Sequence, residues 1–296
     1  MPLVGVGLLA AAWTFVLGGL IGSFLNVVVY RLPRGQSIVL GGSHCPRCAQ
    51  PIHWHDNLPI VGWLMLNGRC RSCRLPIAVR YPLVESVSAG LFLAVFFFEI
   101  VSGGKNIPVR QPDWQHTASL MLDPRLDLVG LACYHAFALS VLLVWGLIAL
   151  DRQRLPARSV VAVLASAVGL SILFPSLHPM PVSARLAEFQ AAGDWLARGL
   201  AVSVVGGLAG VLVGLFWERL LRPLLRGDSA GRTGSPLQPP RFLGIGLALV
   251  GIVLGWQGML GTTVLLGLVC LCHVMLWSSL ARWPTVPPEI LLVPAA

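Results

Sequence analysis

The stretch Leu126–Leu150 reads LDLVGLACYHAFALSVLLVWGLIAL and contains a single charged side chain, Asp127. An apolar stretch of about 17–25 residues is long enough to cross the hydrocarbon core of a bilayer as an α-helix. The whole chain has this character, because 56% of its 296 residues are hydrophobic and only 11% are charged. Soluble domains are typically about 25% charged. The composition therefore excludes a soluble enzyme and a disordered chain, and it predicts a polytopic membrane protein.

Seven stretches of the chain are apolar and long enough to span a membrane. They are Leu3–Tyr30, Pro82–Val101, Leu126–Leu150, Ser159–Pro175, Trp195–Trp217, Phe242–Trp256 and Leu260–Leu280. The sixth is short and rich in glycine, so its assignment is the least secure. We therefore expect an all-α protein with about seven transmembrane helices.

The distribution of Lys and Arg predicts the orientation, because cytoplasmic loops carry an excess of both. The segment from Arg31 to Arg80 contains seven arginines against one acid, Asp56, and the other odd-numbered connections are also basic. The even-numbered connections are near neutral. We therefore expect the N-terminus outside and the C-terminus in the cytoplasm. This bias accounts for the net charge of +9, so the sequence indicates the lipid bilayer, and no nucleic acid, as its charged partner.

These patterns divide the chain into three parts. Residues 1–30 form the first span, residues 31–81 form a cytoplasmic loop domain, and residues 82–296 form a membrane core of six spans.

The loop contains two cysteine pairs, Cys45-Pro-Arg-Cys48 and Cys70-Arg-Ser-Cys73, separated by 21 residues. Two C-x2-C pairs at this spacing are typical of a four-thiolate structural zinc site. Two disulfides or buried free cysteines are the alternatives, but a cytoplasmic loop is kept reduced. A nearby histidine (His44, His53 or His55) could replace one cysteine ligand.

The residues around these pairs resemble a known family. The blocks are Gly22-Ser-Phe-Leu-Asn-Val-Val-Val-Tyr-Arg-Leu-Pro33, Cys45-Pro-Arg-Cys48, Asn57-Leu-Pro59, Gly68-Arg-Cys70-Arg-Ser-Cys73 and Arg80-Tyr-Pro-Leu-Val-Glu85. In this order they resemble the N-terminal domain of the type IV prepilin leader peptidases, which also N-methylate the new terminus. Beyond residue 85 the resemblance is weaker and rests on the span pattern, Leu155-Pro156 and Leu254-Gly-Trp-Gln257.

The resemblance implies a multi-pass protein of the bacterial inner membrane that acts in prepilin processing, or in pilus or type II secretion assembly. It implies prepilin-like partners and, by resemblance only, S-adenosylmethionine as a cofactor. It also implies an intramembrane aspartyl peptidase with two catalytic Asp residues on separate spans. One carboxylate activates water while the other, protonated, polarises the scissile carbonyl, so a single acid cannot fill both roles.

The first catalytic position of the family falls near the end of the third span. Aligned without a gap on Leu155-Pro156, this position is Ala149. Asp151 matches an acidic position two residues further on, and a two-residue deletion would put it in the catalytic slot. We therefore take Asp151 as the candidate catalytic acid. The alternative is a carboxylate at the membrane interface beside Arg152 and Arg154.

The second catalytic position of the family belongs to a Gly-x-Gly-Asp motif, which does not occur in this chain. Counting back from Leu254 without gaps places it on Leu243. Gly227-Asp228 lies some fifteen residues earlier, in a loop where Asp228 is more typical of a turn. Two hypotheses stay open: a divergent peptidase that uses Asp151 with an unidentified second acid, or a zinc-stabilised scaffold or prepilin-binding protein without catalysis.

Three further residues in the spans are candidates because an ionisable group inside a membrane is costly. Glu85 could recognise prepilin or the methyl donor, or it could pair with Arg80 at the membrane surface. We expect Glu99 near the outer interface and His135 as a hydrogen-bonded packing residue.

Overall fold

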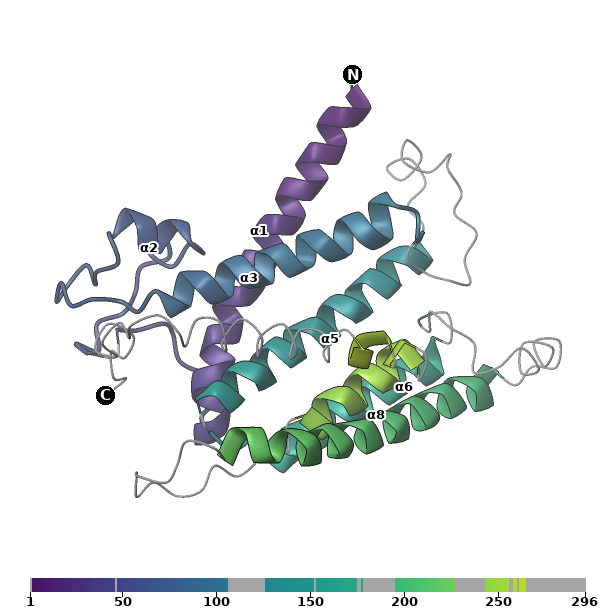
Figure 1. The fold of residues 1–296 in the computed structure, drawn as a ribbon. Helices are drawn as coiled ribbons and strands as arrows, with labels where there is room; N and C mark the ends of the chain where they lie inside the picture. Colours follow the sequence, from purple (N-terminus) through teal and green to yellow (C-terminus); the bar gives the residue numbers. More distant parts are fainter. Residues whose placement is uncertain are drawn as a thin grey trace, which may run out of the picture.

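The computed structural model consists of helices with one irregular lobe beside them (Figure 1). It describes residues 2–45, 47–105, 126–151, 153–174, 177, 195–226, 243–255, 258–259 and 261–264. Within these residues the only β-pairing is two isolated bridges, His44 with Pro51 and Arg69 with Pro76.

The helices follow one another in a simple order. They are α1 (Pro2–Arg31), the 3-10 turn η1 (Leu32–Arg34), α2 (Val61–Met65), α3 (Arg80–Val95), its π-helical continuation η2 (Phe96–Val101), α5 (Leu126–Leu150), α6 (Ala157–Leu173), α8 (Trp195–Arg226) and a short helix, Leu243–Gly255.

Four of these segments are long and apolar enough to cross a membrane: Gly5–Arg34, Arg80–Val101, Leu126–Leu150 and Gly199–Leu220. The helices Ala157–Leu173 and Leu243–Gly255 are apolar but shorter. This confirms the helical membrane class. The count of seven spans and the orientation stay predictions, and most of the stretch Leu260–Leu280 lies outside the described residues.

Two glycines bring α1 and α3 into close contact. A methyl group on Gly18 would lie 2.8 Å from Ala89 Cα, and one on Gly22 would lie 2.8 Å from Glu85 Cα. Four residues apart, these glycines lie on one face of α1, and small residues on such a face let membrane helices approach closely. Asn26 extends the contact, because its side-chain amide donates to the Tyr81 carbonyl at 3.2 Å.

Three more glycines, Gly206, Gly210 and Gly214, lie along one face of α8. A methyl group on any of them would lie 2.0–2.3 Å from the backbone of the helix Leu243–Gly255. Because no side chain separates the two backbones, this pair of helices tolerates no larger residue at these three positions.

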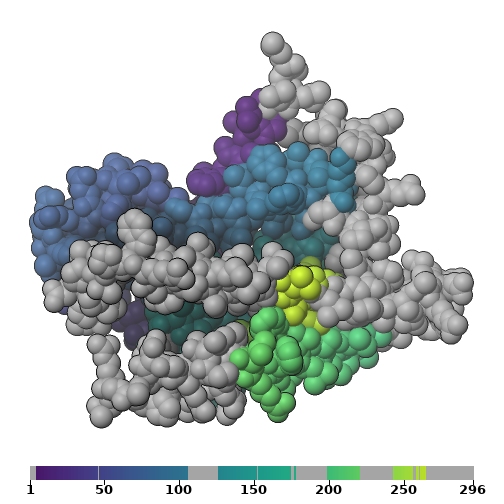
Figure 2. Space-filling model, in the orientation of Figure 1, coloured from purple at the N-terminus to yellow at the C-terminus, as the bar shows by residue number. Residues whose placement is uncertain are grey.

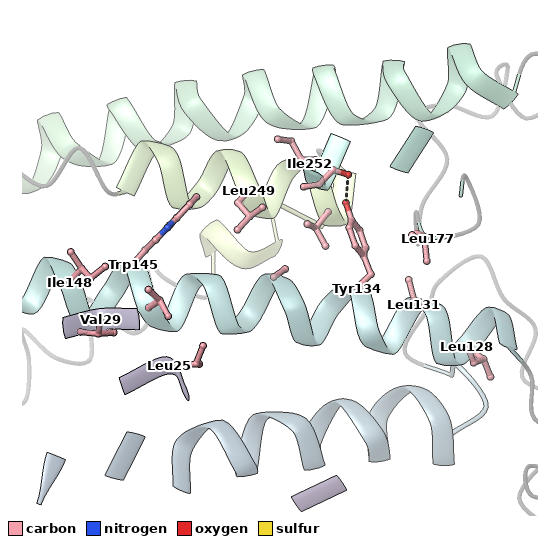
Figure 3. Close-up of a cluster of buried hydrophobic side chains, with 14 residues drawn as sticks. Leu25, Val29, Leu128, Leu131, Tyr134, Trp145, Ile148, Leu177, Leu249 and Ile252 are labelled. Carbon is pink, nitrogen blue, oxygen red and sulfur yellow. Dashed lines mark hydrogen bonds between the residues drawn. The ribbon is translucent and has the colours of Figure 1, made fainter. Parts of the chain in front are cut away.

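The buried core centres on α5 (Figure 3). Trp145 points from α5 toward the helix Leu243–Gly255, where Leu249 and Ile252 are buried. Tyr134 reaches α6, where its hydroxyl contacts the Ala167 carbonyl at 3.0 Å and the Ser171 hydroxyl at 2.8 Å. The core therefore ties α5 to both shorter helices.

Candidate functional site

The residues between α1 and α3 form a lobe beside the helices, in blue in Figure 2. It contains Cys45, Cys48, Cys70 and Cys73, whose Sγ atoms all lie within 4.8 Å of one another. The Sγ atoms of Cys45 and Cys73 are 3.9 Å apart. A tetrahedral ion with sulfur ligands at about 2.3 Å places its ligands about 3.8 Å from each other. The predicted four-cysteine cluster is confirmed, and its geometry fits a metal ion of zinc type.

The two cysteine pairs are copies of one backbone unit. Residues 45–52 read CPRCAQPI and residues 70–77 read CRSCRLPI. In each copy the N–H of the first cysteine donates to a carbonyl five residues later, Gln50 or Leu75, at 2.9 Å in both. An isolated bridge that ends on the proline closes each unit. Each unit thus presents two sulfurs from one tight turn.

Both units contain a residue in the left-handed conformation directly after the second cysteine. These are Ala49, with φ of 56°, and Arg74, with φ of 60°. Their N–H groups donate back to Cys45 and Cys70. L-residues with a side chain seldom adopt this conformation, so each turn is held by its hydrogen bonds and by the cluster.

The backbone of the second turn favours the thiolate form of Cys70. The backbone N–H groups of Cys73 and Ser72 lower the pKa of the Cys70 thiol to about 7. A thiol with a lowered pKa gives up its proton to a metal more readily, because the thiolate is the form that binds.

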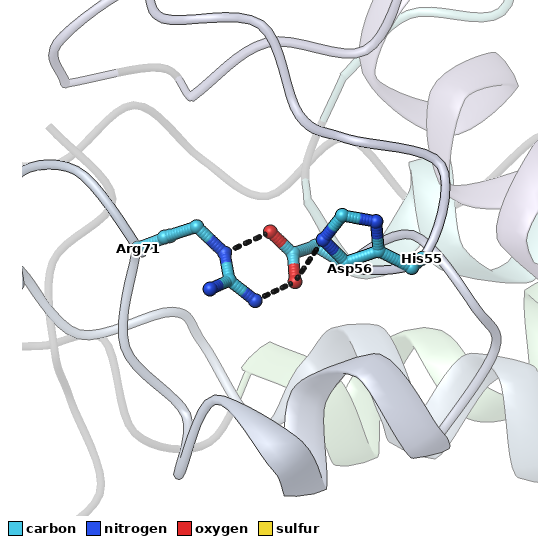
Figure 4. Close-up of polar contacts among 3 residues, drawn as sticks. All are labelled: His55, Asp56 and Arg71. Atoms are coloured by element: carbon cyan, nitrogen blue, oxygen red, sulfur yellow. Dashed lines mark hydrogen bonds and ion pairs between the residues drawn. The ribbon is translucent and has the colours of Figure 1, made fainter.

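An ion pair joins the two halves of the lobe (Figure 4). Arg71, within the second cysteine turn, donates from Nε and Nη2 to the two carboxylate oxygens of Asp56, both at 2.6 Å. His55 Nε2 lies 3.6 Å from the same carboxylate. The hydrogen bonds from Arg71 lower the pKa of Asp56 below its ordinary value. The only acid of the loop is therefore part of the lobe's internal structure.

Arg31, the last residue of α1, fixes the chain that enters the first cysteine turn. Its guanidinium donates to the carbonyls of Ser37, Leu40, Gly41 and Gly42 at 3.0–3.3 Å. Four carbonyls around one cation orient the lobe on the end of the first span.

Glu85 fixes the lobe on the second span. Its Oε2 atom accepts the backbone N–H of Ile60 at 2.7 Å, and Glu85 itself is buried. Ile60 has φ of 62°, a strained value for a β-branched residue. Glu85 therefore holds an unfavourable turn in place. The alternative in which Glu85 pairs with Arg80 is wrong, because Arg80 has another partner.

Arg80 instead binds Asp151. Its two terminal nitrogens donate to the two carboxylate oxygens of Asp151 at 2.5 and 2.8 Å. This bidentate pair joins the start of α3 to the residue after α5, and both side chains are partly exposed. Ala149, the position aligned with the family's first Asp, lies one half-turn earlier within α5.

One acid that the sequence analysis missed lies beside the second aligned position. Glu218 on α8 is buried, and its Oε1 atom accepts the N–H of Gly244 at 3.4 Å. Gly244 directly follows Leu243, where the family's second Asp is expected. Glu218 was detectable because it continues the glycine face of α8 by one turn after Gly214, although it lies one residue beyond the predicted span.

A third buried acid pairs with a histidine. Glu99, only 4% exposed, lies in η2, and its Oε1 atom is 2.5 Å from His135 Nδ1 on α5. His135 is therefore hydrogen-bonded as expected, and its partner is an acid of the preceding span. Within the described residues, Glu99 Oε2 and His135 Nε2 have no hydrogen-bond partner.

Comparisons with known proteins identify the family. Residues 16–98 match the Bacterial Peptidase A24 N-terminal domain, so the match includes the second half of α1 and all of α3 as well as the lobe. A prepilin leader peptidase/N-methyltransferase of Pectobacterium carotovorum is 30% identical over 94% of this chain and 88% of its own length. The chain belongs to the prepilin leader peptidase/N-methyltransferase family.

Two further relatives show how the similarity varies. The type 4 prepilin-like proteins leader peptide-processing enzyme of Escherichia coli is 37% identical over 65% of this chain and 76% of its own length. The Myxococcus xanthus prepilin leader peptidase/N-methyltransferase is 53% identical, but the match covers 30% of this chain and 26% of that protein. The match to the Klebsiella pneumoniae prepilin leader peptidase/N-methyltransferase covers 39% of the length of that relative. No solved structure matches this chain.

Proposed function

We propose that this protein binds prepilins in the bacterial inner membrane and acts in their processing, or in assembly of a pilus or type II secretion apparatus, without the usual aspartyl dyad. Family membership supports the prepilin partner. The ordered lobe, fixed by Arg31 and Glu85 on the first two spans, supports the retention of a binding platform.

The observation that carries this proposal is the environment of Asp151. Both of its carboxylate oxygens accept hydrogen bonds from Arg80. A general base must present a lone pair to the water that it deprotonates, and this bidentate pairing turns both oxygens toward Arg80. Ala149 and Leu243, the aligned positions, have no ionisable group. The proposal therefore assigns Asp151 a structural role.

The test uses the full-length protein in detergent with a prepilin that carries its leader. We expect the prepilin to co-purify with the protein and its leader to stay uncut. Replacing all four cysteines of the cluster by serine should abolish binding if the lobe is the platform. Failure of the wild-type protein to retain the prepilin would reject the proposed role.

Glu218 favours a second candidate function, an active peptidase that uses Asp151 and Glu218. The C-terminal ends of α5 and α8 and the start of the helix Leu243–Gly255 lie toward the same end of the bundle (Figure 1). One carboxylate would take a proton from water as the water oxygen attacks the scissile carbonyl carbon. The other, protonated, would donate to the carbonyl oxygen, and the C–N bond would break as the amine gains a proton.

Two isosteric variants distinguish the candidates. Glu218→Gln can still accept the Gly244 N–H, so a structural role survives it and an acid–base role does not. If this candidate is correct, the wild type cuts the prepilin, and Glu218→Gln and Asp151→Asn each lower the rate by about 100-fold or more. Ser203→Ala, which changes another buried polar residue of α8, should leave the rate unchanged. Uncut prepilin with the wild type excludes this candidate.

We also propose zinc as the metal of the four-cysteine cluster. Four thiolates close the coordination sphere, so zinc would supply folding energy to the lobe and no catalysis. Metal analysis of the purified protein should find one zinc per chain, and less than one in a Cys70→Ser variant. S-adenosylmethionine as a methyl donor rests on the family resemblance, and a methyl-transfer assay on the cut prepilin tests it.

A further inference from the structure

The longest segment of the lobe without a polar residue is part of its second half. Residues 58–66 read LPIVGWLML, and they include α2. Leu64 is 58% exposed and Met65 is 69% exposed, and Leu58 and Val61 are also exposed. Large apolar side chains gathered in one short segment are unusual on a surface that faces water.

The contacts of Pro59 and Ile60 place the start of this segment alongside the spans. Pro59 lies against Gly19 of α1, where a methyl group would be 3.3 Å from its Cβ, and Ile60 donates to Glu85 of α3. Asn26 and Tyr81 are in contact nearer the basic ends of the same helices. At a rise of 1.5 Å per residue, Gly19 is about 10 Å along α1 from Asn26, and Glu85 is about 8 Å along α3 from Arg80.

The length of the second span indicates how deep Glu85 lies in the bilayer. The segment Arg80–Val101 has 22 residues, and about 20 helical residues are needed to cross the hydrocarbon core. A helix that is only just long enough has Arg80 at the interface and Glu85 inside it. The turn that Glu85 holds then lies inside the bilayer boundary as well.

Several N–H groups of the segment have acceptors within the protein, as a non-aqueous setting requires. The N–H of Gly62 donates to Leu58 at 2.8 Å, and the N–H groups of Leu64 and Leu66 donate within the segment at 3.1 Å. The amide of Ile60, at the strained turn, has Glu85 as its acceptor. The indole N–H of Trp63 donates to the Ile77 carbonyl at 3.1 Å. None of these groups depends on water.

We propose that residues 58–66 form a re-entrant segment that enters the adjacent leaflet, with Val61, Leu64 and Met65 in contact with lipid acyl chains. The cysteine cluster and Arg31 lie on the aqueous side of this segment, and Glu85 anchors it from within the membrane. The lobe is therefore attached to the spans at two points, Arg31 on the aqueous side and Glu85 within the membrane. This inference does not depend on prepilin binding or catalysis.

The test reads the depth of a nitroxide label in the metal-loaded full-length protein, reconstituted in vesicles of phosphatidylethanolamine and phosphatidylglycerol. The label is attached at Met65→Cys in a background with Cys133, Cys270 and Cys272 replaced by alanine. Phe98→Cys, on the exposed face of η2, is the lipid reference. Gln50→Cys, in the first cysteine unit, is the aqueous reference.

We expect the label at residue 65 to collide frequently with dissolved oxygen and rarely with a water-soluble nickel chelate, as the label at residue 98 does. Collision with the chelate equal to that at Gln50 would overturn the proposal. Protection from both reagents would also overturn it, because protein would then cover the segment. Leu64→Cys repeats the measurement one residue away, and a zinc content of one per chain verifies that each variant has folded its lobe.

Discussion

The region before residue 105 and the region after residue 126 are held together by different means. In the first, side chains bind the backbone of the lobe, as Glu85 binds Ile60 and Arg31 binds the loop carbonyls, and α1 meets α3 closely at two glycines. In the second, backbones touch directly at Gly206, Gly210 and Gly214, and apolar side chains pack around α5. Tyr134 and Glu218 add hydrogen bonds to backbone groups of neighbouring helices.

This difference has a consequence for how each region tolerates change. Directed hydrogen bonds and a four-sulfur cluster specify one geometry, and the match to the family's N-terminal domain lies in this region. Packing of small and apolar residues specifies close approach and leaves the identity of other side chains freer. Four predictions test whether the two regions are as separate as this contrast implies.

Metal removal should have the largest effect, and it should be confined to the first region. A strong chelator, or Cys70→Ser, should expose the lobe to proteolysis, because metal-binding free energy is folding free energy in such a loop. The helices from α5 onward should keep their thermal transition, measured by circular dichroism in detergent. A chelator that melts both regions together would show that they form one cooperative unit.

Gly210→Ala should destabilise the second region alone. The new methyl group would lie 2.1 Å from the Leu247 carbonyl oxygen, and overpacking of this kind costs about 1–3 kcal/mol. Gly169→Ala on α6, with nothing within 4 Å, is the matched control and should be neutral or slightly stabilising. Thermal unfolding of the two variants in detergent measures the difference, and equal behaviour would contradict the backbone contact.

Glu85→Ala should loosen the lobe from α3 without unfolding it. The Ile60 N–H would lose its acceptor, and a buried unpaired donor costs about 1–3 kcal/mol. Glu85→Gln keeps an acceptor oxygen and should cost less. Protease sensitivity between α2 and α3, measured with zinc bound, reports the effect. Gly210→Ala, in the second region, should leave this protease sensitivity unchanged.

Asp56→Asn should have the smallest effect, and that effect should depend on pH. Because Arg71 lowers the pKa of Asp56 in the folded lobe, the pair stabilises the lobe above the unfolded pKa, about 4. This stabilisation is lost as pH falls through the lowered folded value. Wild type and variant should therefore differ in proteolysis rate at pH 6–7 and converge toward pH 3. A difference that persists at low pH would falsify the ion-pair explanation.

Local spacing was sufficient to predict the helices and the cysteine cluster. The four cysteines are set by tight turns, whose geometry depends on neighbours in sequence. Leu126–Leu150 is helical at the predicted bounds, because a long apolar stretch has few other ways to satisfy its backbone in lipid.

The sequence could not predict which distant groups would meet. Arg80 could have paired with Glu85, five residues away, but the fold brings Asp151 to it from the end of α5. The partner of Glu218 could not be predicted for a similar reason, since Gly244 is 26 residues away. The close approach of α8 to the helix Leu243–Gly255 depends on glycines of both segments, and only the assembled structure pairs them.

The π-helical turn at Phe96–Val101 sets which way the side chains face where α3 continues toward residue 101. A π turn contains one residue more than the α turn it replaces, and one residue corresponds to about 100° of rotation. If the same residues followed a regular α-helix, Glu99 would swing away from His135 by about a quarter of a circle. The π turn therefore decides whether that acid meets the imidazole or the lipid.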